Sequence, residues 1–332
     1  MHKIFLIALL TLHIHDIKAQ KYYSSKPTLL PSKFINGERF YLKLVTVTGD
    51  TILGFCDTGG GITALLPTTV EKLNLQSKVK EMIIDDSKMG YILFSDVIKD
   101  KKIPPISIMP MSGIKASYFA VPDKKFMESE GQFFIKFVPQ DAFLGQFFFL
   151  DKAWTIDYLK KEVWVNTSIK KNSKSADIQQ LGFKKDKEGK KLYGHPSMKI
   201  IVDGDTLDVL LDTGATFILS TNGKSKLNVT DNAIGGSFIA KSVFEKWHQN
   251  HPEWKIIEKG DGKSDIIEVP KIKIGKNQIG PVLFSVRPDE AWSKQMISTM
   301  DKVVKGAIGG SAFKYLKIKI DYNNELAEFT SK

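Results

Sequence analysis

The tripeptide Asp-Thr-Gly occurs twice in the chain, at Asp57–Gly59 and at Asp212–Gly214. Each copy directly follows an apolar run, so each aspartate is expected at the end of a strand. A single aspartate before a small-residue turn most often only caps the turn. Two aspartates in equivalent places can bring two carboxylates together, and such a pair can perform general acid–base chemistry.

The repeat extends on both sides of the tripeptides. Gly-Asp-Thr precedes each catalytic candidate at the same interval, at positions 49–51 and 204–206. Downstream, an apolar run ending in glycine is followed twelve residues later by Asp-Tyr in both halves: Leu144-Gly145 by Asp157-Tyr158, and Ile308-Gly309 by Asp321-Tyr322. The segments between these motifs differ in length. The pattern therefore indicates an internal duplication with loop insertions.

These motifs resemble the aspartic peptidases of the pepsin and retropepsin type. In that family a strand ends in Asp-Thr/Ser-Gly, and a later apolar-Gly strand of the same lobe supports the loop. The resemblance covers nearly all of the mature chain. It implies a mostly β, bilobal acid-protease fold, in which two pseudo-twofold-related, β-barrel-like lobes enclose a cleft.

The resemblance also implies roles for the motif residues. Asp57 and Asp212 would be catalytic. Their neighbours would have supporting roles: the hydroxyls of Thr58 and Thr213 would bond to the backbone of the opposite loop, and Gly59 and Gly214 would allow close approach and donate N–H groups toward the carboxylates.

One departure from the family pattern follows the first motif. The residue after the first Asp-Thr-Gly is Gly60, followed by Gly61. The pepsin type usually has a hydroxyl-bearing residue directly after this motif. We expect the change to remove a hydrogen bond to Asp57 and to loosen the loop. In the second copy the equivalent residue is Ala215, a common variant.

A β-hairpin after the first catalytic loop is expected to cover the substrate in enzymes of this type. The best segment is Met82–Ile84, a turn at 85–90 and then Tyr91–Phe94. Tyr91 is the candidate for the aromatic residue of this flap. The alternative, that Tyr91 is an ordinary residue of a core strand, stays open.

Length and composition fit two mostly β domains. A chain of 332 residues exceeds what one core usually holds. Its 21 Phe and 9 Tyr, with many Ile and Val, favour strands. Only two helices are indicated, one at 67–73, where Pro67 suits a helix start, and one at about 240–250, before Pro252.

The duplication and the lysine-rich runs near its midpoint set the expected boundaries. We expect a signal peptide at 1–19, an N-terminal lobe at 20–168, an interlobe connection at 169–190 and a C-terminal lobe at 191–332. The connection and its border carry the lysine runs 170–175 and 184–191.

The first twenty residues have the parts of a secretory signal. Lys3 precedes the apolar run Ile4–Leu12, which is too short to span a bilayer, and Ala19-Gln20 suits cleavage. We expect an exported bacterial protein, periplasmic or secreted, without a membrane segment after signal removal. A buried N-terminal strand is the alternative.

Other chemistries find little support in the sequence. The net charge of +11 comes mostly from lysine, and no basic cluster is interleaved with aromatics, so we expect no nucleic-acid partner. The single cysteine, Cys56, is expected to face the interior, because strand neighbours point to opposite faces. Glu245, His248 and His251 mimic metal spacing without a convincing further ligand, and His195 is the only other histidine after the signal. We therefore expect neither a metal nor another cofactor.

Three functions remain open from the sequence alone. The first is an aspartic endopeptidase that acts on a peptide or protein substrate and is complete in one chain, hence a monomer. The second is a peptide-binding or interaction protein that keeps the fold without catalysis. The third is another hydrolase, for instance a glycosidase, whose two carboxylates must lie about 5 Å or more apart.

Overall fold

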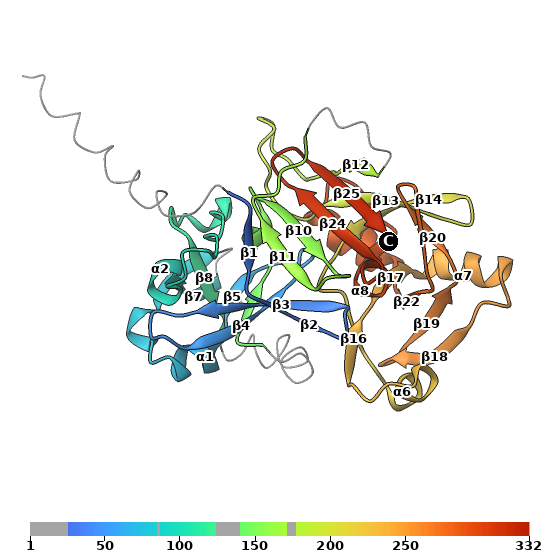
Figure 1. Cartoon of the computed structure of the whole chain (residues 1–332), viewed down its shortest axis with the longest axis horizontal. Helices are drawn as coiled ribbons and strands as arrows, with labels where there is room; N and C mark the ends of the chain where they lie inside the picture. Colours follow the sequence, from blue (N-terminus) through green and yellow to red (C-terminus); the bar gives the residue numbers. More distant parts are fainter. Residues whose placement is uncertain (1–25, 85–86, 124–139, 171–176, 332) are drawn as a thin grey trace, which may run out of the picture.

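The computed structural model describes residues 26–84, 87–123, 140–170 and 177–331. The expected signal peptide at 1–19 and part of the expected flap turn, Asp85-Asp86, lie outside these residues. The fold is mostly β, as expected, and most of its strands belong to three large sheets (Figure 1).

The first sheet is built from residues of the first half of the chain. Its eight strands run in the spatial order β2-β3-β4-β9-β5-β8-β7-β6. Their bounds are β2 Ser32–Ile35, β3 Arg39–Val45, β4 Thr51–Cys56, β5 Thr63–Leu65, β6 Lys80–Ile84, β7 Ser87–Leu93, β8 Tyr118–Val121 and β9 Ala142–Leu144. The short helices of this half are α1 Pro67–Lys72, α2 Phe94–Val97 and α5 Gln146–Phe149. Helix α1 matches the expected one and begins at its proline.

The second sheet is built from the second half in the order β18-β19-β22-β17-β23-β14-β13-β20-β21, and β15 and β16 pair separately. The bounds are β13 Ser197–Val202, β14 Asp205–Leu211, β15 Thr216–Ile218, β16 Ala233–Gly235, β17 Ser237–Ala240, β18 Ile256–Asp261, β19 Ser264–Val269, β20 Ile272–Ile274, β21 Asn277–Ile279, β22 Val282–Arg287 and β23 Gly306–Ile308. Its helices are α6 Thr221–Leu227, α7 Lys241–Asn250 and α8 Gly310–Phe313. Helix α7 is the second expected helix.

The third sheet joins the two halves. Its order is β1-β11-β10-β24-β25-β12, with β1 Thr28–Leu30, β10 Ala153–Asp157, β11 Glu162–Val165, β12 Ile178–Gln180, β24 Leu316–Asp321 and β25 Leu326–Ser331. The repeated Asp-Tyr motifs end β10 and β24, which pair antiparallel. Trp154 pairs with Ile320 and Ile156 with Ile318, so the register is symmetric about Thr155 and Lys319. The equivalent strands of the two repeats therefore pair with each other about an approximate twofold axis.

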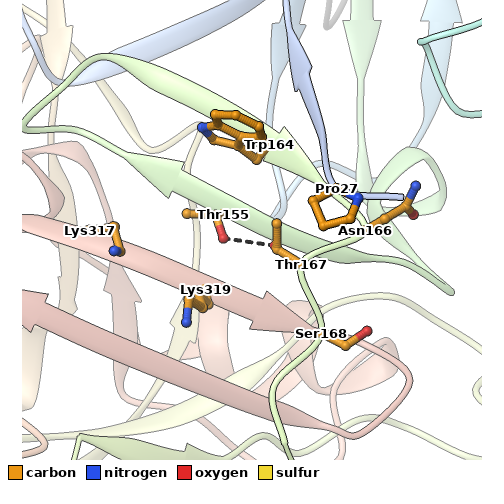
Figure 2. Close-up of a pocket in the computed structure, with 8 residues that line it drawn as sticks. All are labelled: Pro27, Thr155, Trp164, Asn166, Thr167, Ser168, Lys317 and Lys319. Atoms are coloured by element: carbon orange, nitrogen blue, oxygen red, sulfur yellow. Dashed lines mark hydrogen bonds between the residues drawn. The ribbon is translucent and has the colours of Figure 1, made fainter. Parts of the chain in front are cut away.

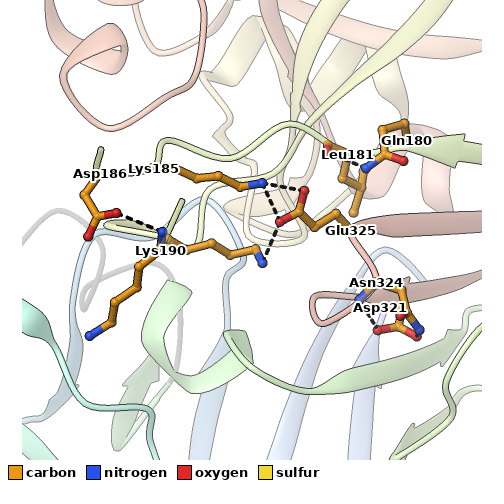
Figure 3. A network of polar contacts seen from close by, with 9 residues as sticks. Gln180, Leu181, Lys185, Asp186, Lys190, Asp321, Asn324 and Glu325 are labelled. Carbon is orange, nitrogen blue, oxygen red and sulfur yellow. Dashed lines mark hydrogen bonds and ion pairs between the residues drawn. The ribbon is translucent and has the colours of Figure 1, made fainter. Parts of the chain in front are cut away.

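The expected connection at 169–190 is more structured than a tether. It contains β12, which pairs with β25. Lys185 forms an ion pair with Glu325, in the turn after β24 (Figure 3). Lys191 pairs with the same carboxylate at 2.8 Å. Burial alone would raise the pKa of Glu325, but the two ammonium groups outweigh burial and lower it. The lysine-rich segment is thus anchored to the sheet that joins the halves.

Among the described residues, no helix is both long enough and apolar enough to cross a membrane.

Candidate active site

Equivalent strand pairs place Asp57 and Asp212. Strand β4 ends directly before Asp57 and lies parallel to β9; β14 ends directly before Asp212 and lies parallel to β23. The Asp57 N–H donates to the carbonyl of Leu144 at 3.0 Å, and the Asp212 N–H donates to that of Ile308 at 2.9 Å. The apolar-Gly strands therefore support both loops as the repeat predicts.

The two loops lock each other through their threonines. The Thr58 hydroxyl donates to the Leu211 carbonyl at 2.7 Å and accepts the N–H of Thr213 at 3.0 Å. The Thr213 hydroxyl donates to the Cys56 carbonyl at 3.0 Å and accepts the N–H of Thr58 at 3.1 Å. Both hydroxyls are buried. This reciprocal set fixes the spacing and orientation of the loops from which both aspartates project.

The carboxyl groups of Asp57 and Asp212 are close enough to hydrogen-bond each other. Burial raises the pKa of Asp57 well above its usual range, and the charge of Asp212 raises it further. Burial also raises the pKa of Asp212. Because two adjacent carboxylates cannot both ionise easily, the pair shares one proton, and its titration belongs to the pair.

Backbone amides stabilise the ionised form of the pair. The Gly59 N–H donates to Asp57 Oδ1 at 2.9 Å, and the Gly214 N–H donates to Asp212 Oδ1 at 3.0 Å. The loops also approach each other closely. A Cβ at Gly214 would lie 2.1 Å from the Asp57 Cγ, and one at Gly59 would lie 2.6 Å from the Asp212 Cγ. Only glycine therefore fits at both positions without displacing the opposite carboxyl.

Comparisons with known proteins identify no family for this chain. No protein-family model matches it, and no curated protein is significantly similar to it in sequence.

The loosening expected at Gly60-Gly61 is not found. The Gly60 carbonyl accepts the N–H of Gln146 at 2.9 Å, and the Gly61 carbonyl accepts the Gln146 side-chain amide at 3.0 Å. A Cβ at position 60 would lie 2.4 Å from the Phe143 ring, so a larger residue there would have to displace the ring. The ring occupies the space that a hydroxyl-bearing side chain would need, and other residues restrain the loop.

Two of the restraining residues are Gln146 and His195, and the sequence analysis assigned neither of them to the site. Gln146 directly follows the Leu144-Gly145 motif, and His195 is one of three histidines beyond the signal. His195 comes from the second half of the chain, yet its Nε2 lies 3.4 Å from the Gly60 carbonyl. A carbonyl oxygen only accepts, so Nε2 carries a proton, and Nδ1 lies 2.9 Å from the Thr299 hydroxyl.

We expect His195 to make the stability of the protein fall at acid pH. Burial lowers the pKa of His195 to about 4, so the native state keeps it neutral while the unfolded chain binds a proton below about 6.5. Its contribution to the free energy of unfolding is complete above pH 6.5 and is lost as the pH falls toward 4, by up to about 3 kcal/mol.

Urea titrations at pH 7 and pH 4.5 measure this effect. His195→Gln should lose less stability than the wild type between these values. The carboxyl pair, whose raised pKa gives the opposite slope, is present in both proteins and cancels in the comparison. Equal slopes for the two proteins would contradict the assignment.

A hairpin lies in the segment expected for the flap, but its second strand, β7, begins at Ser87, inside the expected turn at 85–90, and Tyr91 lies within this strand. Strands β6 and β7 pair antiparallel, with Ile84 opposite Ser87. The Tyr91 ring contacts that of Tyr118 edge-on, with centroids 5.6 Å apart. It packs against a small apolar cluster that includes Met82, as the alternative of a core strand residue implied.

The other reactive side chains considered in the sequence analysis show no arrangement for catalysis in the described residues. Cys56 is fully buried, as expected, and burial raises its pKa well above the usual range, so it is no ready nucleophile. His251 pairs with Asp203 and stacks on Trp254. In the described part of the chain, no group of three or more His, Cys, Asp or Glu side chains is arranged to hold a metal ion.

A hollow of about 540 Å³ lies elsewhere, on the sheet that joins the two halves (Figure 2). Trp164, Thr155, Lys317 and Lys319 are among the eight residues that line it, and none of the eight is acidic. Lys319 is already paired with Glu328 at 2.7 Å. The hollow thus has no carboxyl pair, and Asp57 and Asp212 remain the candidates for acid–base chemistry.

Proposed function

We propose that this chain is an aspartic endopeptidase, with two acid-protease lobes in one chain and Asp57 and Asp212 as its catalytic pair. One observation carries the proposal: two carboxyl groups from equivalent loops each lie against the glycine of the opposite loop, and the loops are locked by reciprocal threonine bonds. A structural ion pair or turn cap would not require this twofold arrangement. Because Ile4–Leu12 has the pattern of a secretory signal, we also propose that the enzyme acts after export.

The proposed reaction needs one water and no cofactor. The ionised member of the pair takes a proton from a water held between the carboxyls, and the water oxygen attacks the carbonyl carbon of the peptide. The protonated member donates a hydrogen bond to the carbonyl oxygen as negative charge develops there. The proton then passes to the leaving nitrogen as the C–N bond breaks. The pair therefore holds one proton before the attack, two after it and one again once the nitrogen is protonated, so it returns to its starting state.

The alternatives find less support. A glycosidase needs its carboxyls about 5 Å or more apart, so that sugar and water fit between them. Here the two loops approach so closely that each carboxyl lies against the glycine beside the other. A binding protein that had lost catalysis could keep both threonines for stability but would have no reason to keep both buried carboxyls, and the bonds to the Gly60 and Gly61 carbonyls weaken the feature that favoured it.

Hydrolysis of a casein-type substrate tests the proposal directly. Cleavage between pH 3 and 7 should be abolished by a statine-type transition-state analogue and should resist a metal chelator and a serine-directed inhibitor. Tight statine binding without cleavage would indicate the peptide-binding alternative. Absence of both would end the proposal.

We also expect activity in the monomer. Aspartic peptidases with one Asp-Thr-Gly per chain must dimerise, whereas both copies here lie in one chain, and β10 and β24 hold the halves together. A covalent link keeps the two loops at an effective concentration of about millimolar. Specific activity should therefore stay constant on dilution through the nanomolar range. A decline that followed a dimer dissociation curve would contradict this expectation.

A further inference from the structure

We infer that Gln146 and His195 form a brace that holds the first catalytic loop in position, in place of the hydroxyl missing at Gly60. The brace is defined as these two side chains with their bonds to Gly60, Gly61 and Gly194. Its role as a positioning device for Asp57 rests on the proposed peptidase function. Its existence as a loop restraint does not.

Gln146 satisfies all its polar groups at this junction. Its backbone N–H and side-chain amide hold the carbonyls of Gly60 and Gly61, and its Oε1 accepts the N–H of Gly194 at 2.6 Å. The residue is only 2% exposed. A Cβ at Gly194 would lie 2.9 Å from the Gln146 carbonyl oxygen, so the two segments touch closely. Gln146 therefore ties the first catalytic loop to the second half of the chain.

His195 adds a second tie from the next position. It is 3% exposed, and its Nε2–H points at the same Gly60 carbonyl that Gln146 holds. The other ring nitrogen, Nδ1, lies 2.9 Å from the Thr299 hydroxyl, which also lies within donating distance of the Met296 carbonyl. Because Gly60 lies three residues beyond Asp57 and its N–H bonds back to the Asp57 carbonyl at 3.2 Å, the brace restrains the turn that carries the carboxyl.

In the described part of the chain, the second catalytic loop has no counterpart of Gln146. The position equivalent to Gln146 is Gly310, where a Cβ would lie 2.3 Å from the Glu38 carbonyl oxygen. The Ala215 carbonyl, equivalent to that of Gly60, accepts the N–H of Gly236 at 2.8 Å. Within the described residues, this carbonyl is held by backbone of its own half, whereas the Gly60 and Gly61 carbonyls are held by Gln146 and His195, one from each half. The brace thus breaks the twofold symmetry of the site.

The test compares Gln146→Leu with Gln180→Leu, which changes an exposed glutamine away from the site. Hydrogen–deuterium exchange of the Gly59 and Gly60 amides should become at least about tenfold faster in Gln146→Leu only. The kcat of Gln146→Leu for a peptide taken from the casein-type substrate should fall about tenfold to a hundredfold, while KM changes less than about threefold. Misplaced catalytic groups lower the rate of the reaction more than they weaken substrate binding.

His195 separates positioning from packing. His195→Phe keeps a ring of similar size without a donor, and His195→Gln keeps a donor. We expect a kcat loss of about threefold to tenfold in the first and recovery to within twofold in the second. If Gln146→Leu does not fold, Gln146→Asn, whose amide falls one methylene short, gives the same comparison.

Failure of the brace and failure of the peptidase proposal are distinguishable. Unchanged exchange and kcat in Gln146→Leu would overturn the brace while hydrolysis by the wild type continued. A wild type without statine-sensitive hydrolysis would overturn the peptidase proposal and with it the catalytic role of the brace, and exchange would still decide whether the brace restrains the loop.

Discussion

Replacement of either Asp57 or Asp212 by asparagine is expected to reduce peptide hydrolysis by about a thousandfold or more, because each carboxyl has a role that the other cannot fill alone. An amide at either position can neither take the proton of the water nor share one with its partner. The fold should persist, since the amide oxygen of the asparagine can still accept the N–H of Gly59 or Gly214. Measured kcat with the casein-derived peptide gives the result.

Asp50→Asn is the matched control. Asp50 belongs to the same repeat but is exposed, and its carboxylate accepts a local bond from the Thr48 hydroxyl. Its activity should stay within about twofold of the wild type, as is usual for a surface change. Thermal melts of all three variants establish that they are folded. Near-normal turnover in either pair variant, with a native melt, would show that the two carboxyls do not act together.

The sequence predicts the features of the site that depend on neighbouring residues or that recur in both halves of the chain. Each Asp-Thr-Gly follows an apolar run, so the strand end and the tight turn are written in adjacent residues. The repeat then identified the supporting strands β9 and β23, because an equivalent apolar-Gly run recurs in each half. The symmetric pairing of β10 with β24 is likewise foreshadowed by the repeated Asp-Tyr.

The parts that the sequence does not predict are long-range contacts without a counterpart in the other half. The residue of the second half that is equivalent to Gln146 is Gly310, so comparison of the two halves cannot reveal the brace. The sequence shows that Gly60 lacks a hydroxyl, but not that the Phe143 ring fills its place. Strand β12 has three residues between lysine runs, too few for a period to emerge, and it forms because β25 offers an edge.

The other large effect is expected in Thr213→Val, which should lower the free energy of unfolding by about 2–5 kcal/mol. Valine matches threonine in shape, so packing is kept while the hydroxyl is lost. The N–H of Thr58 and the carbonyl of Cys56 then lose their partners in a buried place, and each such group costs about 1–3 kcal/mol. Urea-induced unfolding measures the loss, and kcat should fall with it because the loops lose their register.

Two comparisons isolate the interlocking hydroxyl from the general effect of removing one. Thr213→Ser keeps the oxygen and should retain most of the stability and the activity. Thr155→Val removes a hydroxyl that bonds only to the Thr167 hydroxyl, at 2.8 Å beside the hollow of Figure 2, and should cost about 1 kcal/mol or less, because its partner can turn to water. If Thr213→Val were no more damaging than Thr155→Val, the threonine bonds between the loops would not hold the two halves in register, and the spacing of the carboxyl pair would have to depend on the β10–β24 pairing instead.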